Sequence, residues 1–184
     1  MDIVGPIIFQ FVMIALNAIF ACAEIAVLSV NDAKIAQLKE KGDKRAARLE
    51  KLTTDSSRFL ATIQVAITLA GFLGSAFAAS NFAVYLNPLF EKWGLDASAA
   101  NTVSVIIITV LLSYITLVFG ELVPKRVAMK KSEKMALALS GLLRFVATLT
   151  APIVWFLSVS TNGVLRLMGI DPKETEEAAS EDDI

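Results

Sequence analysis

The sequence predicts an all-α membrane protein with three transmembrane helices and further helices that lie along, or re-enter, one surface of the bilayer. Hydrophobic residues make up 55% of the 184 residues, and the mean hydropathy of +0.64 is too high for an ordinary soluble domain. The apolar residues form runs long enough to cross a bilayer, which takes about 20 residues. We therefore expect residues 1–170 to form a transmembrane module in contact with lipid.

The first span is expected over residues 3–30, and it contains two strongly polar residues, Asn17 and Glu24. They are seven positions apart, so they share one face of a helix. A polar face within the membrane points toward a bundle interior or a cavity. Asn17 fits best as an interhelical hydrogen-bonding residue, whereas Glu24 suits a structural and a functional role equally well.

Residues 32–54 form a polar segment with an excess of Lys and Arg, which places it in the cytoplasm by the positive-inside rule. Scattered apolar positions predict a pair of surface helices broken near Gly42, with a solvated loop as the alternative.

The second span is expected over residues 59–86, followed by an external loop over residues 87–101. Gly71 and Gly74 would allow another backbone to approach closely. The polar and small residues of this span recur at spacings of 4, 3 and 4, which places them on one helical stripe: Gln64, Thr68, Gly71 and Ser75. Such a stripe is primarily a packing face, and it becomes an ion site only if carboxylates of other helices meet it.

The third span, over residues 102–124, contains one charge, Glu121, near its inner end. A carboxylate in a hydrophobic segment is a functional-site candidate. Pro124 has no N–H, so a helix passing through it leaves the carbonyl of Gly120 without its donor. One turn would then present a carboxylate and a backbone oxygen together, and both are donors that Mg²⁺, Ca²⁺ or Na⁺ accepts.

Residues 133–169 form a last apolar region that is interrupted by Arg144 and Pro152 and flanked by basic residues at both ends. We expect two helices hinged near Pro152 that lie in or re-enter the inner leaflet, with a fourth crossing as the alternative. Three crossings put the N-terminus outside and the C-terminus in the cytoplasm. Residues 171–184 are acidic and are expected to form a solvated tail.

Three segments resemble one known family: residues 20–26, residues 62–69 and, most specifically, the Gly-Glu-x-x-Pro-Lys motif at residues 120–125. The family is the CorC / cyclin M (CNNM) group, and the second segment is similar to its haemolysin-like branch. The resemblance implies three transmembrane helices, a belt of juxtamembrane helices and a homodimer. It also implies that the acidic tail leads into cytoplasmic CBS domains that bind adenine nucleotides, which these 184 residues do not include.

The resemblance further implies transport of Mg²⁺ across the inner cell membrane, usually as export and coupled to Na⁺. It assigns the ion site to the carbonyl of Gly120 and the carboxylate of Glu121, with Pro124 and Lys125 completing the motif. The chain departs from the family pattern in its first two helices, for example at Ala21. The candidate donors from those helices are therefore Glu24, Ser29, Gln64, Thr68 and Ser75.

Two other functions remain open from the residues. The same acidic groups suit an organic cation such as a polyamine, or the module is a membrane anchor and dimerisation platform for the cytoplasmic domains. We expect no enzyme, because the chain has no histidine, no phosphate-binding loop and a single cysteine within an apolar run. We expect no nucleic-acid partner.

Overall fold

The computed structural model describes residues 3–170, so the predicted acidic tail at residues 171–184 lies outside the described residues. The described part is helical, without strands, and its elements follow one another in this order: α1 (Val4–Leu28), α2 (Asp32–Glu40), α3 (Lys44–Thr53), α4 (Ser56–Lys92), α5 (Ala97–Leu117), the π-helical turn η1 (Val118–Leu122), α6 (Val123–Lys130) and α7 (Ser132–Leu167).

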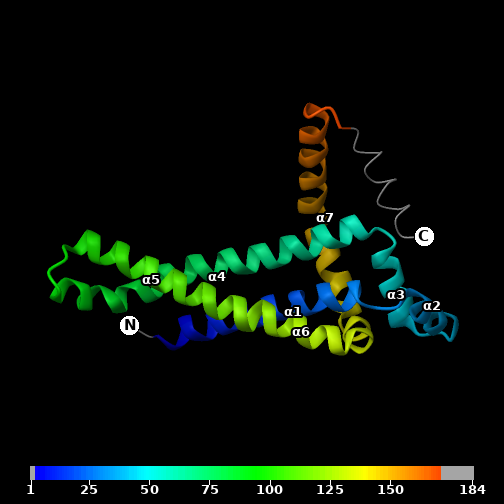
Figure 1. Ribbon diagram of the computed structural model, residues 1–184, viewed down its shortest axis with the longest axis horizontal. Helices are drawn as coiled ribbons and strands as arrows, with labels where there is room; N and C mark the ends of the chain where they lie inside the picture. Colours follow the sequence, from blue (N-terminus) through cyan, green and yellow to red (C-terminus); the bar gives the residue numbers. More distant parts are fainter. Residues whose placement is uncertain (1–2, 171–184) are drawn as a thin grey trace.

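Helices α1, α4 and α5 run side by side along the long axis of the molecule (Figure 1). The α4–α5 hairpin closes one end of this bundle, and the short helices α2 and α3 lie at the other end. Helix α7 packs against α1, α3 and α4 and runs across the long axis instead of along it. Four segments are long and apolar enough to cross a membrane, and one of them is Ser132–Leu167.

Side-chain caps mark the beginnings of α2, α3, α4 and α5. Asn31, Asp43, Asp55 and Asp96 each precede a helix and accept a hydrogen bond from a backbone N–H of its first turn. These N–H groups have no partner within the helix, so a side-chain oxygen satisfies them. Between α2 and α3 the chain turns at Gly42, whose φ of +86° favours glycine.

The apolar core lies where α1, α3, α4 and α7 meet, at the end of the bundle that carries the charged residues. Leu49 of α3, Ile63 of α4 and Leu143 of α7 are each 1% exposed and belong to one cluster with Ala23 of α1. The juxtamembrane helices are thus packed parts of the fold and not a loose loop.

The predicted loop between the second and third spans is present but shorter than the expected residues 87–101. Helix α4 continues through Pro88 to Lys92, and α5 begins at Ala97. The amide of Asn87 donates to Asn101 Oδ1 at 3.3 Å across the hairpin. Since proline removes one backbone donor only, a helix already paired with a neighbour can continue through it.

The predicted hinge at Pro152 is wrong, because α7 is one helix from Ser132 to Leu167. Val154 and Thr150 on either side of the proline are buried, so both halves of the helix are packed against the rest of the molecule. A single lost hydrogen bond is insufficient to separate them.

Candidate functional site

The predicted irregularity in the third span is a π-helical turn, η1, that contains both Gly120 and Glu121. In this turn each N–H reaches back five residues instead of four, and the N–H of Val123 bonds to the carbonyl of Val118. Pro124 follows at the start of α6. The wider turn precedes the one residue that cannot donate, and such turns are frequent at functional sites.

Gly120 is buried where this turn meets the middle of α1. A Cβ placed on it would lie 3.3 Å from Asn17 Cβ, 3.3 Å from Thr116 Cγ2 and 3.4 Å from the carbonyl oxygen of Ile14. A side chain at position 120 would therefore push α1 away. The glycine brings the backbone of η1 directly against Asn17, and it places Glu121 beside the same helix.

Two carboxylates from different helices meet on one lysine. Lys125 Nζ lies 3.0 Å from Glu121 Oε1 and 3.1 Å from Glu24 Oε2. The three side chains are half-buried, at 25% exposure for Lys125, 32% for Glu121 and 23% for Glu24. We call Glu24, Glu121 and Lys125 the charged triad; together they carry one net negative charge.

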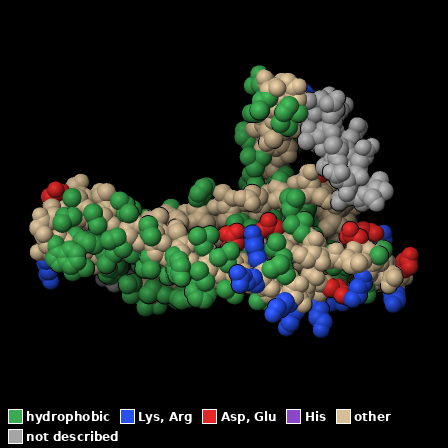
Figure 2. All heavy atoms as spheres, viewed as in Figure 1, with side chains coloured by type: hydrophobic (Ala, Val, Ile, Leu, Met, Phe, Trp, Pro, Cys, Tyr) green, Lys and Arg blue, Asp and Glu red, His purple; other side chains and the backbone are tan. Residues whose placement is uncertain are grey.

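The triad's elements, α1, η1 and α6, adjoin the apolar part of the bundle. Figure 2 shows acidic and basic side chains together at the border between the largely apolar half of the molecule and the end where most Lys and Arg gather. A carboxylate pair at such a border is costly unless it is neutralised, and Lys125 supplies that neutralisation.

A polar line along α1 extends from the triad into the apolar half. Gln10, Asn17 and Glu24 recur at intervals of seven, so they share one helical face. Gln10 and Asn17 are buried, and their side-chain oxygens have no hydrogen-bond partner among the described residues. A cavity of about 10 Å³ touches both side chains and is also lined by Thr116 and Gly74, which is close to the size of one water. The sequence interpretation missed Gln10, although the heptad spacing indicates it.

The other candidates do not join this cluster within one chain. Ser29 is exposed at the end of α1. Gln64 is exposed, and its amide donates to Thr68 Oγ1 at 3.4 Å, while Ser75 is half-buried. In the described part of the chain, none of these residues has a hydrogen bond to Glu24, Glu121 or Asn17.

A different face of α4 packs on α1. Its small residues recur at intervals of four and are all buried: Ala66, Ala70, Gly74 and Ala78. A Cβ on Gly74 would lie 3.3 Å from Met13 Cβ, whereas one on Gly71 would meet nothing within 4 Å. Small residues allow this close approach, and the polar stripe lies beside the seam they form, not in it.

Within residues 3–170 no three or more carboxylate, thiol or imidazole groups lie close enough together to hold a metal ion. A cation at this site would therefore be held by the two carboxylates of the triad together with amide, backbone or water oxygens.

A comparison with known protein families identifies the family of this chain. The family described as the cyclin M transmembrane N-terminal domain matches residues 8–184. The chain belongs to the cyclin M transmembrane family. It is a multi-pass membrane protein, as its long apolar helices also indicate.

Several relatives of this cyclin M chain match it almost throughout. The UPF0053 protein sll0260 of Synechocystis is 38% identical over 174 residues, 95% of this chain and 39% of that protein. YhdT of Bacillus subtilis is 34% identical over 185 residues, all of this chain and 40% of that protein. The polyamine export protein of Haemophilus influenzae is 30% identical over 187 residues, 99% of this chain and 42% of that protein. The chain thus spans about two-fifths of the length of these relatives.

Proposed function

We propose that this cyclin M chain is the membrane-embedded part of a cation exporter, with Mg²⁺ as its cargo and Glu24 and Glu121 as its anionic ligands. The observation that carries the proposal is the convergence of these carboxylates on Lys125 at a π-helical turn. A Glu121–Lys125 pair alone would suit a membrane anchor, whereas here two carboxylates from different helices meet on one lysine. They do so where a helix gives up its regular hydrogen bonding, which is the arrangement expected of an ion site.

The oxygen chemistry supports Mg²⁺ as the cargo. Asn17 adds a buried amide oxygen beside Gly120, and the backbone of the π-helical turn adds carbonyl groups. Mg²⁺ accepts carboxylate and carbonyl oxygens and keeps several waters, because it dehydrates reluctantly. Two carboxylates and retained water are a common way to bind it, so a larger protein cage is unnecessary.

Lys125 acts as the resident counter-charge in this mechanism. With no cation bound, its ammonium group neutralises the pair of carboxylates and prevents their mutual repulsion. An entering Mg²⁺ takes over that task and releases Lys125 toward the charged end of the bundle. Because Glu24 lies on α1 and Glu121 on η1, exchange between the lysine and the ion changes how strongly these helices are tied together, which couples occupancy to movement.

The wider assembly follows the family resemblance. We propose a homodimer in the cell membrane with three crossings per chain, α7 lying along the inner leaflet and the C-terminus in the cytoplasm. In the rest of the protein, CBS domains that bind adenine nucleotides would regulate export, and inward movement of Na⁺ would drive it.

A polyamine is the second candidate cargo, and two observations favour it. One relative is named a polyamine export protein. In addition, Lys125 is itself an alkylammonium group between two carboxylates, at 3.0 and 3.1 Å. The end of a polyamine has the same chemistry and could replace the lysine at the same oxygens.

The test is flux into liposomes that contain the purified protein, with Mg²⁺, Ca²⁺, Mn²⁺ and spermidine compared in the presence and absence of a Na⁺ gradient. Glu121→Gln and Glu24→Gln should each abolish Mg²⁺ flux and the rise in melting temperature that Mg²⁺ produces. Glu133→Gln is the matched control, because Glu133 pairs with Lys34 at the surface and should keep both properties.

Unchanged Mg²⁺ flux and unchanged Mg²⁺ stabilisation in Glu121→Gln would refute the proposal. Spermidine flux without Mg²⁺ flux would identify the polyamine as cargo. If the unmodified protein moves none of these cations, the triad is a structural ion pair and the module is an anchor for the cytoplasmic domains.

A further inference from the structure

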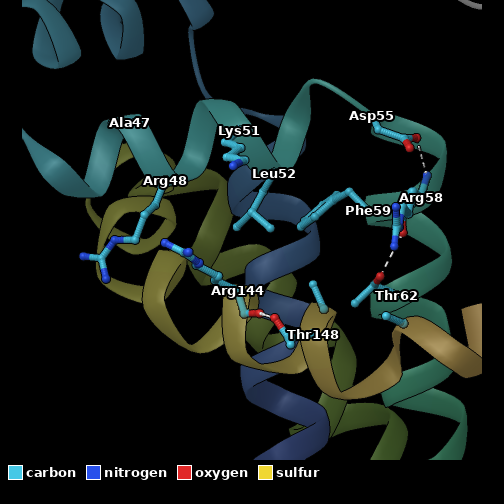
Figure 3. Close-up of a pocket in the computed structure, with 12 residues that line it drawn as sticks. Ala47, Arg48, Lys51, Leu52, Asp55, Arg58, Phe59, Thr62, Arg144 and Thr148 are labelled. Atoms are coloured by element: carbon cyan, nitrogen blue, oxygen red, sulfur yellow. Dashed lines mark hydrogen bonds between the residues drawn. The ribbon is translucent and has the colours of Figure 1, made fainter.

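A second polar feature of the molecule lies away from the charged triad, in a cavity of about 580 Å³ between α3, the start of α4 and the middle of α7. Figure 3 shows its lining residues, which come from all three helices and surround one open space. We call it the basic cavity, because four cationic side chains line it: Arg48, Lys51, Arg58 and Arg144. The transport mechanism uses none of them.

The charge of this cavity is uncompensated within residues 3–170. None of its four cationic side chains has a carboxylate partner among the ion pairs of the described residues. Asp55 is the acidic residue in the lining, and its Oδ1 accepts the backbone N–H of Arg58 at 2.9 Å to cap α4. Four cations against one carboxylate, itself occupied as a cap, make a site that favours an anion.

Arg144 now has a structural context. It interrupts an apolar helix, and a charged side chain within such a helix usually has a partner or a polar surrounding. Here it lies in the cavity with Arg48, and Arg48 Nη1 lies 3.4 Å from where a Cβ on Gly141 would be, one turn before Arg144. Two arginines from different helices therefore lie together in one cavity. A basic surface loop would not need to bring them together in this way.

The remaining wall is apolar and continues into an exposed apolar part of α7. Leu52, Phe59, Ala147 and Ala151 line the cavity. Four residues beyond Ala151, on the same helical face, Trp155 is 67% exposed. The cavity thus joins a cationic region to an exposed apolar track.

We propose that the basic cavity binds the phosphate headgroup of an anionic phospholipid, with an acyl chain along the Trp155 face of α7. One guanidinium group can bind two phosphate oxygens at the same time. Basic pockets between membrane helices on the cytoplasmic side suit anionic headgroups. The bundle end that carries α2, α3 and the basic cavity is the one that the charge bias predicts to be cytoplasmic. The inference is independent of the cargo.

Because it is negatively charged, the acidic tail of the same chain is the other candidate occupant of the basic cavity. Between Pro172 and Ile184 the tail has no apolar side chain larger than alanine, so its acidic part has little to place against the wall formed by Leu52 and Phe59. A phospholipid matches both the charge and the apolar wall, and for that reason we favour it.

The test is native mass spectrometry of the purified protein with phosphatidylglycerol and phosphatidylcholine of the same acyl chains. We expect preferential binding of phosphatidylglycerol, weakened about fivefold by loss of one cation in Arg144→Gln or Arg48→Gln. Lys51→Gln is a milder variant of the same cavity, should the arginine changes impair folding. Arg166→Gln, which removes an exposed charge of α7 outside the cavity, should leave binding unchanged.

Equal binding of the two lipids would overturn the proposal, as would an equal loss in Arg166→Gln, because diffuse surface charge would then explain the preference. Competition by millimolar glycerol phosphate as strong as that by the lipid would show that free phosphate is sufficient and would also contradict it. A variant with its tail carboxylates changed to amides separates the rival: if lipid preference appears only in that variant, the tail occupies the cavity.

Discussion

Replacing Gly120 by alanine tests the close contact between the π-helical turn and α1. The added Cβ would meet Asn17 Cβ at 3.3 Å and the carbonyl oxygen of Ile14 at 3.4 Å. Both belong to α1 at or next to its backbone, so no side-chain rotation can relieve the contact. Helix α1 must move by a few tenths of an ångström, and Glu24 moves with it.

The magnitude follows from two opposing effects. Overpacking of a tight contact costs about 1–3 kcal/mol, while alanine in place of glycine gains up to about 1 kcal/mol of helix propensity. Gly163→Ala is the matched control, because a Cβ on Gly163 meets nothing within 4 Å and that variant gains propensity alone. The two variants should therefore differ by about 1–3 kcal/mol, with Gly120→Ala the less stable.

Thermal unfolding of the purified protein in detergent measures this difference. At about 2–4 °C per kcal/mol for a chain of this size, Gly120→Ala should melt several degrees below Gly163→Ala, and its Mg²⁺ flux should fall as Glu24 is displaced. A Gly120→Ala protein as stable as Gly163→Ala would mean that η1 and α1 are not in close contact. The reasoning about how the triad is assembled would then fail.

Three further changes test other parts of the structure. Lys125→Met removes the shared ammonium and should strengthen Mg²⁺ binding about tenfold, the equivalent of about 1.4 kcal/mol. The Mg²⁺-induced rise in melting temperature measures this change, with Arg126→Met as the control. Weaker Mg²⁺ binding in Lys125→Met would contradict the counter-charge role. Leu49→Ala should lower the free energy of unfolding by about 2–5 kcal/mol, because Leu49 is 1% exposed. Leu142→Ala, at a site that is 37% exposed, should lower it much less. Similar melting temperatures of the two variants would mean that α3 is not packed on the core. A side-chain hydrogen bond from Arg45 lowers the pKa of Asp43 from 3.8 to about 2, so its stabilising effect is complete above pH 3.8 and is lost as the pH falls through about 2. A carboxyl titration by NMR should find this value and its return toward 3.8 in Arg45→Gln, and an unshifted pKa in the unmodified protein would disprove the contact.

The sequence was sufficient to predict irregular hydrogen bonding near Gly120 and Glu121, since Pro124 cannot donate to the carbonyl four residues before it, but it did not predict the π-helical turn. The sequence also indicated that Glu24, an isolated charge in an apolar run, needs a polar partner. It could not predict that one ammonium group contacts both carboxylates. That depends on the crossing of α1 with η1, which is set by the absence of a side chain at position 120.

Proline was the main source of error elsewhere. Pro88 and Pro152 suggested a loop and a hinge, yet both lie within continuous helices. Local sequence gives the cost of a proline, about 3 kcal/mol in a helix interior, but not the packing on either side that offsets it. Val154 and Thr150 are buried there, and α7 packs against α1, α3 and α4, which are distant in sequence.

The polar stripe of α4 was predicted both as a packing face and as a source of ion ligands, and these two uses compete for the same surface. Gln64 and Thr68 bond to each other and not to the triad, and Gly71 has open space where a Cβ would be. Amide and hydroxyl groups facing hydrocarbon are unfavourable, so this stripe needs either water or a second copy of the chain against it. If the homodimer forms there, the stripe supplies packing at Gly71, and the ion at the triad takes its remaining oxygens from Asn17, the backbone of η1 and water. The second-helix donors expected from the family resemblance are then unnecessary, and Glu24 and Glu121 meet on Lys125 without them.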